Sequence, residues 1–278
     1  MKRLLVVKVG DTLPALAARR GDFEDWILAG MSIDERRAVV VDVRTGVGLP
    51  AYSDLAGVVY HLNKPGQTRS GRSPDRARCG SVGRPATAPQ AYSDPAGVVI
   101  TGSHAMVTER ADWSEQTAAW LPGLVERGIP VLGICYGHQL LAHALGGTVG
   151  DNPLGREYGT VDVHLTDEAH ADALLGALPT PVRVQVSHTQ SVLALPAGAR
   201  RLAWSDGDPN QAFVVGERAW GVQFHPEFDR DVVVTYIDRY RQALIDEGQD
   251  PDRLIEMSED TIYGSMILSR FGQVVEQA

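Results

Sequence analysis

The chain has 278 residues and a formal net charge of −9 at pH 7. Its length suits one large domain or two small ones, and its apolar fraction of 44% is typical of a soluble globular protein. The acidic balance argues against non-specific nucleic-acid binding, which needs a basic surface. The apolar runs are too short for a membrane span, and two cysteines, Cys79 and Cys135, are too few for a disulfide framework. We therefore expect a cytoplasmic protein with neither nucleic acid nor membrane as a partner.

The first half of the chain alternates between strand-like and helix-like segments. Short β-branched runs predict buried strands, and amphipathic stretches that end in glycine predict helices. This alternation predicts a mostly parallel sheet with helices on both faces. Strands are expected at 3–9, 38–43, 96–103 and 129–134, and helices at 13–30 (with a break at Gly21), 112–128 and 136–147.

The second half has a different pattern. From residue 159 to residue 224, short strand-like runs with turn residues between them predict antiparallel additions to the sheet. Helical patterns at 229–246 and 258–276 predict a C-terminal helical extension over 229–278. We expect all of these segments to form a single domain, 1–278.

One basic segment interrupts the alternation. Residues 60–90 are rich in Gly, Pro, Ser and Arg, and such a stretch buries too little apolar surface to offset its ordering entropy. A local duplication flanks it, because "AYSDLAGVV" at 51–59 recurs as "AYSDPAGVV" at 91–99. We expect the second copy to supply a strand, and the first copy with 60–90 to form a surface insertion that includes Cys79. A basic docking loop for an acidic partner is the alternative.

Cys135 stands where the apolar run "VLGI" turns into a helical pattern. A nucleophile on a tight strand-to-helix turn has a strained backbone and an exposed side chain. Crowding there favours glycine two residues to either side, and Gly133 and Gly137 occupy both positions. The start of the helix would add a positive partial charge beside the sulfur. The pattern predicts a nucleophile; a buried structural cysteine is the alternative.

A proton acceptor for this cysteine is found in "GVQFHPEF", residues 221–228. In an extended segment, residues i and i+2 lie on one face. Glu227 can therefore orient the imidazole of His225 while His225 takes the proton from Cys135. A His-x-Glu pair also occurs in metal sites, but no further ligand stands at a useful spacing, so we expect no metal and no cofactor.

Two motifs together carry a family resemblance. "GICYGHQLLAHALGG" (133–147), followed by "GVQFHPEF" (221–228), resembles the class I (triad) glutamine amidotransferase family, closest to the glutaminase domain of GMP synthase and its stand-alone relatives. Three further segments, "VVITGS" (98–103), "GREYGTV" (155–161) and "VSHTQSV" (186–192), are also similar to that family. The resemblance implies a flavodoxin-like α/β core with antiparallel additions.

The resemblance also implies a glutaminase half-reaction. Cys135 would attack the side-chain amide of glutamine, ammonia would leave with a proton from His225, and water would hydrolyse the γ-glutamyl thioester. Two backbone N–H groups would hold the oxyanion, one from Tyr136 and one from Gly102 or Ser103.

Substrate binding follows from the same resemblance. Gln139 lies one helical turn after Cys135 and would hold the substrate. Thr189 and Gln190 stand where the family commonly has an aspartate after the Ser-His pair, so glutamine and another γ-glutamyl compound both remain open as substrates. The other residues implied in substrate binding are Tyr158, Gly159, Ser187 and His188.

Three functions remain open. The chain resembles no ATP-dependent synthase domain, so we expect it to need a separate ammonia-accepting synthase to complete an amidotransfer. The second reading is a free-standing γ-glutamyl hydrolase or transferase acting on a small metabolite. The third is a non-catalytic regulatory protein that keeps the fold, in which a displaced oxyanion loop next to the duplication would leave the site unformed.

Overall fold

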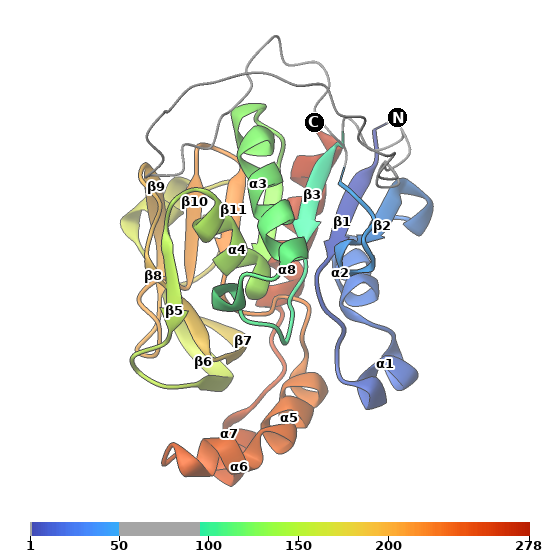
Figure 1. Cartoon of the computed structure of the whole chain (residues 1–278). Coiled ribbons are helices and arrows are strands. Elements are labelled where there is room, and N and C mark those ends of the chain that lie inside the picture. Colours follow the sequence, from blue (N-terminus) through green and yellow to red (C-terminus); the bar gives the residue numbers. More distant parts are fainter. Residues whose placement is uncertain (1, 50–94) are drawn as a thin grey trace, which may run out of the picture.

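In the computed structural model, a nine-stranded sheet runs through the part of the chain that the structure describes, residues 2–49 and 95–278 (Figure 1). Five neighbouring strands, in the order β2-β1-β3-β4-β11, are parallel, and β10, β9, β6 and β7 continue the sheet antiparallel. The predicted mixed sheet with a mostly parallel core is therefore confirmed. Its strands are β1 (Leu4–Lys8), β2 (Ala38–Asp42), β3 (Gly97–Ile100), β4 (Val131–Ile134), β6 (Glu157–Leu165), β7 (Val182–His188), β9 (Ala199–Trp204), β10 (Ala212–Val215) and β11 (Ala219–Val222).

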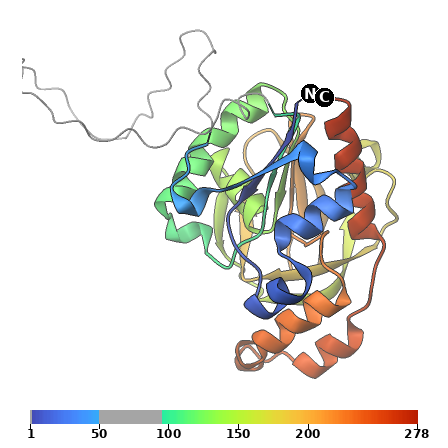
Figure 2. The ribbon, with the colours of Figure 1, turned by 90° about the vertical axis from the view of Figure 1, so that its right-hand side faces the viewer.

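Helices cover both faces of the parallel half of the sheet. The helices α3 and α4 lie on one face, and α2 and α8 pack together on the other (Figures 1 and 2). A separate antiparallel pair, β5 (Thr148–Asp151) with β8 (Gln190–Ala194), lies beside α4. Within the described ranges, no helix combines the length and the apolar character that crossing a membrane requires. The helices are α1 (Pro14–Arg20), α2 (Phe23–Met31), α3 (Asp112–Glu126), α4 (Tyr136–Ala144), α5 (Arg230–Arg239), α6 (Arg241–Asp246), α7 (Pro251–Met257) and α8 (Tyr263–Glu276).

The alternation of side chains along β1 explains the two layers of helices. Leu4 and Val6 belong to the apolar cluster that includes α2 and α8, whereas Leu5 and Val7 belong to the cluster that includes α3 and α4. All four are almost fully buried. Each such side chain stabilises the fold by about 1.5–3 kcal/mol, so a strand that is apolar at every position requires cover on both faces.

The duplicated segment contributes one strand within the described residues. β3 includes Gly97, Val98 and Val99 of the second copy and pairs in parallel with β1 and β4. The first copy (51–59) and the basic segment (60–90) lie outside the described residues.

The C-terminal helices reach the edge of the sheet where the parallel strands end. α5, α6 and α7 lie together at the end of the molecule opposite the two termini (Figures 1 and 2). α5 and α7 pack against β6, and α5 also packs against β7. The carboxyl ends of parallel strands are where α/β proteins place their ligands, so these helices cover the edge at which Cys135 stands.

Candidate active site

Cys135 occupies the sharp turn between β4 and α4. Its backbone has φ 50° and ψ −100°, a conformation that costs a non-glycine residue free energy and is found mainly at functional sites. Cys135 N–H donates to Val222 O at 2.9 Å, and Cys135 O accepts from Gln139 N–H at 3.1 Å, which begins α4. The turn is thus held between a neighbouring strand and the helix that follows.

The two glycines around Cys135 are required by close backbone packing. A Cβ at Gly133 would overlap the carbonyl group of Gly137, and a Cβ at Gly137 would overlap the carbonyl oxygen of Ile100 at the end of β3. Both obstacles are backbone atoms, which have no alternative rotamer. The crowding predicted for this turn therefore has an identified cause at each position.

His225 follows β11 and lies beside the turn. Its ring Nδ1 is 2.8 Å from Glu227 Oε1, and the ring of Phe228 stacks on the imidazole with centroids 3.9 Å apart. Its backbone N–H donates to Gln185 O at 2.8 Å. Burial alone would lower the pKa of His225, but the Glu227 carboxylate and the hydrogen-bonded side chain of Cys135 raise it to about 10. The imidazole is therefore held in one orientation with a strong preference for its protonated form.

A pocket opens above Cys135 and contains most of the residues that the sequence singled out. Gly102, Gly159 and Glu227 do not line it: Gly102 packs against the ring of His225, Gly159 faces Leu254 of α7, and Glu227 lies behind His225. Among the described residues, no group of His, Cys, Asp and Glu side chains is arranged to hold a metal ion. The predicted residues that line the pocket are Cys135, Tyr136, Gln139, Ser103, Tyr158, Ser187, His188 and His225.

Two of the predicted binding side chains make other contacts. Gln139 Nε2 donates to Gln190 O at 2.7 Å and to Gln223 Oε1 at 3.0 Å. His188 Nε2 lies 2.8 Å from Glu157 Oε2, and its Nδ1 lies 3.1 Å from Gln190 O. Both side chains are almost fully buried. Their contacts make them fixed parts of the pocket wall.

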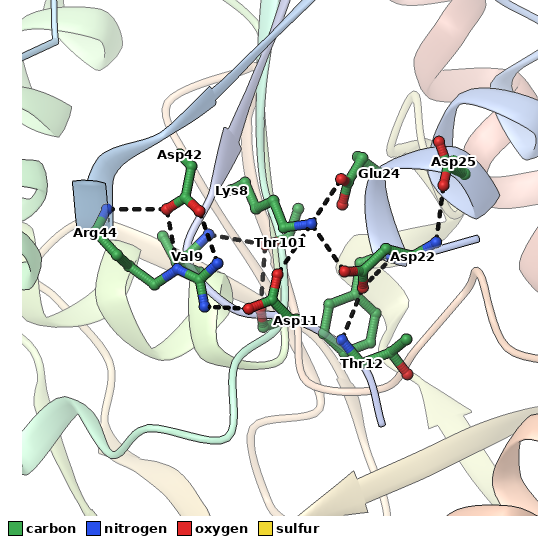
Figure 3. A network of polar contacts seen from close by, with 12 residues as sticks. Lys8, Val9, Asp11, Thr12, Asp22, Glu24, Asp25, Asp42, Arg44 and Thr101 are labelled. Atoms are coloured by element: carbon green, nitrogen blue, oxygen red, sulfur yellow. Dashed lines mark hydrogen bonds and ion pairs between the residues drawn. The ribbon is translucent and has the colours of Figure 1, made fainter. Parts of the chain in front are cut away.

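A network of charged residues supports the loop that carries Ser103 (Figure 3). Lys8, at the end of β1, contacts the carboxylates of Asp11, Asp22 and Glu24 at 3.1, 2.8 and 2.6 Å. Burial alone would lower the pKa of Lys8, but the three carboxylates raise it. This network fixes the chain that follows β1.

That chain makes close contact with the pocket loop. Val9 N–H donates to Thr101 Oγ1 at 3.1 Å (Figure 3). The same hydroxyl donates to Gly102 O at 3.1 Å. Gly10 packs so closely on Ser103 that a Cβ there would meet the Ser103 Cα at 2.5 Å. The hydroxyl of Thr101 and the close packing of Gly10 therefore fix the orientation of the Gly102–Ser103 peptide.

Further pocket residues come from elements that the sequence did not connect with the site. Tyr236 of α5 and Tyr240, the residue that follows α5, line the pocket. The Tyr236 hydroxyl lies 3.0 Å from His104 Nε2 and 3.1 Å from Thr12 Oγ1. Arg156 also lines the pocket and donates to Thr189. Their positions depend on long-range packing, and no local motif marks them.

Comparisons with known proteins match about half of this chain. The family model "Glutamine amidotransferase class-I" matches residues 77–233. GMP synthase [glutamine-hydrolyzing] from Aeropyrum pernix is 41% identical over 138 residues, which are 50% of this chain and 25% of that protein. The corresponding enzyme from Porphyromonas gingivalis is 37% identical over 140 residues, 50% of this chain and 26% of the relative. The chain thus matches about a quarter of the length of these curated relatives.

Solved structures share the fold. A glutamine amidotransferase from Thermotoga maritima superposes with a TM-score of 0.67 at 20% identity, covering 99% of both chains. A glutamine amidotransferase from Methylobacillus flagellatus gives a TM-score of 0.63 at 19% identity, covering 99% of this chain and 95% of the other.

Proposed function

Since this chain belongs to the class-I glutamine amidotransferase family, we propose that it is a cysteine-dependent amidohydrolase of the glutaminase type. It hydrolyses the side-chain amide of glutamine or of a related γ-glutamyl compound through a γ-glutamyl thioester, and it releases ammonia. The observation that carries the proposal is Cys135 on its strained turn, in one pocket with a histidine that Glu227 orients. A nucleophile, a base and an orienting carboxylate are the parts that acyl transfer needs.

We assign each chemical step to a residue of the pocket or to the carboxylate behind it. Cys135 Sγ forms a bond to the amide carbon, and His225 protonates the departing nitrogen so that the C–N bond breaks and ammonia leaves. Water then attacks the thioester, His225 accepts its proton, and the sulfur leaves to regenerate the free enzyme. Glu227 stays ionised throughout and stabilises the imidazolium.

The oxyanion formed in both steps requires backbone donors. A carbonyl and the N–H that follows it in the same trans peptide point in opposite directions. Because Gly102 O accepts from Thr101 Oγ1, the N–H of Ser103 points away from Thr101, and Ser103 lines the pocket. We propose the N–H groups of Ser103 and of Tyr136, the first residue of α4, as the two donors, with Gly102 giving the loop room beside His225. Removing one such donor costs about 3 kcal/mol of barrier.

The fate of the ammonia distinguishes two forms of this function. In the first, the chain delivers ammonia to a separate synthase, a form supported by its similarity to GMP synthase [glutamine-hydrolyzing]. In the second, it is a free-standing γ-glutamyl hydrolase. The second form is favoured by Thr189 and Gln190, which place no carboxylate after His188.

The test is release of ammonia from L-glutamine and from a panel of γ-glutamyl amides and dipeptides by the purified chain. We expect turnover by the wild type and none by Cys135→Ala, whose fold circular dichroism should show to be intact. Hydrolysis that persists in a clean Cys135→Ala preparation would refute the assignment of the nucleophile. Turnover of glutamine that rises only when a synthase is added supports the first form, and full activity of the chain alone supports the second.

A further inference from the structure

The pocket that contains Cys135 is lined by an arginine and, among the described residues, by no aspartate or glutamate. Arg156 carries a permanent positive charge, whereas burial lowers the pKa of His104. His188 and His225 also line the pocket, and each contacts a glutamate that does not line it. The imbalance is a property of the site itself, because the chain as a whole is acidic.

Two glutamates that contact lining histidines are already bound to other protein groups. Glu227 has no exposed side-chain surface and binds His225. Glu157 accepts from His188 Nε2 at 2.8 Å, from Gln211 Nε2 at 2.6 Å and from Ser205 Oγ at 2.7 Å. Both oxygens of Glu157 therefore already accept hydrogen bonds from protein side chains.

Arg156 is held firmly in position. Its Nε donates to Glu247 Oε1 at 2.7 Å, and its backbone N–H donates to Glu247 Oε2 at 3.0 Å. Its Nη1 donates to Thr189 Oγ1 at 2.9 Å. Glu247, which follows α6, does not line the pocket, whereas Thr189 does. The guanidinium is therefore fixed through its Nε side, and its Nη1 lies at the pocket wall.

The pocket favours the α-carboxylate of an amino acid over its α-ammonium group. A carboxylate that enters the pocket meets a pre-oriented guanidinium, the geometry that favours charge-assisted hydrogen bonds. An ammonium group meets the positive charge of Arg156 and loses water without gaining a carboxylate partner among the described lining residues. Free glutamine carries both groups.

We propose that the pocket selects terminal amides whose other end carries a carboxylate and no ammonium group, with Arg156 binding that carboxylate. The substrate class is the monoamides of dicarboxylic acids and glutamine derivatives with a blocked α-amino group. This inference rests on the proposed amidohydrolase function and names the substrate class of the same site.

The test compares three amides that differ only in charge at the far end: L-glutamine, glutaramate (the same chain without the α-amino group) and pentanamide (neither charge). Since a hydrogen bond to a charged group contributes about 1.5–3 kcal/mol, we expect kcat/KM for glutaramate to exceed that for pentanamide by roughly 10- to 100-fold. We expect kcat/KM for L-glutamine to be lower than that for glutaramate, because its ammonium group is desolvated without a carboxylate partner. Arg156→Gln should remove most of the advantage of glutaramate over pentanamide by raising KM, and Arg156→Lys should restore part of it. Arg218→Gln, on an exposed turn at the far end of β10 and β11, is the matched control and should change neither value.

Binding to Cys135→Ala, measured by calorimetry with glutaramate and with L-glutamine, separates recognition from catalysis. An equal or higher kcat/KM for L-glutamine overturns the inference and leaves the proposed function standing. If the wild type hydrolyses none of the amides while Cys135→Ala still prefers glutaramate, the proposed function falls and the recognition stands. Equal binding of both ligands overturns the inference in either case.

Discussion

His225 Nδ1 and Glu227 Oε1 lie 2.8 Å apart, and the side chain of Glu227 has no contact with solvent. Glu227→Gln keeps the size of this partner and removes its charge. We expect kcat to fall by a factor on the order of 10²–10⁴ with little change in KM, because general acid–base catalysis contributes about that much. We also expect the pKa of His225 to fall from its raised value, which NMR titration of the imidazole can follow.

Glu217→Gln is the control for this substitution, because Glu217 is exposed on the turn between β10 and β11. It should leave kcat and the titration of His225 unchanged. If Glu227→Gln retains wild-type kcat, Glu227 has no role in orienting the base.

Gly137 should tolerate no side chain. Its Cβ would overlap the carbonyl oxygen of Ile100, and β3 is fixed between β1 and β4. We expect Gly137→Ala to lower the free energy of unfolding in urea by roughly 1–3 kcal/mol, as overpacking does, and to reduce activity by shifting Cys135. Gly150→Ala is the control, because the nearest atom there is the flexible end of Leu193. Equal stability of the two variants would show that the turn is not tightly packed.

Local patterns were enough to predict the centre of this site. The glycines on either side of Cys135 and the alternation that relates His225 to Glu227 act within a few residues, so each can be recognised from one segment. The apolar runs likewise predicted the parallel strands, because every position of β1 and β3 except Lys8 is buried.

The rest of the site depends on contacts between distant segments. Tyr236 reaches the pocket only because α5 packs against β6 and β7. Arg156 is fixed by Glu247, which is 91 residues away in sequence. The amide of Gln139 is bound by Gln190 and Gln223, which the position of Gln139 on α4 does not reveal. The sequence shows which residue types are present, but the partners of each side chain follow from the fold.

His138 should make stability depend on pH on the acidic side. It is fully buried next to Phe213, with ring centroids 4.9 Å apart, and burial lowers its pKa to about 3. An unfolded histidine titrates near pH 6.5, so between these values the unfolded state binds the additional proton. Stability is therefore lost as pH falls through this window, by about 2 kcal/mol at pH 5 from this residue.

Urea unfolding of the wild type and of His138→Leu at pH 7 and pH 5 measures this contribution. We expect the loss of stability on acidification to be smaller in His138→Leu by about that amount. His170→Gln, at an exposed position, should keep the wild-type dependence on pH. The same pH dependence in all three proteins would mean that His138 is accessible to protons in the folded state.

The duplication predicts that one copy of the repeat is dispensable. Deleting residues 60–99 joins Val59 to Ile100 and replaces the Gly-Val-Val of β3, residues 97–99, by the identical residues 57–59. The glycine matters, because a Cβ at Gly97 would lie 2.5 Å from Val275 Cγ2. Since every β3 position keeps its residue type, we expect a folded protein with wild-type activity, measured by urea unfolding and ammonia release. Deleting 60–100 instead shortens the strand by one residue and should unfold the protein, because a one-residue shift reverses which side chains face each layer. An unfolded product from the 60–99 deletion would show that the removed segment belongs to the core.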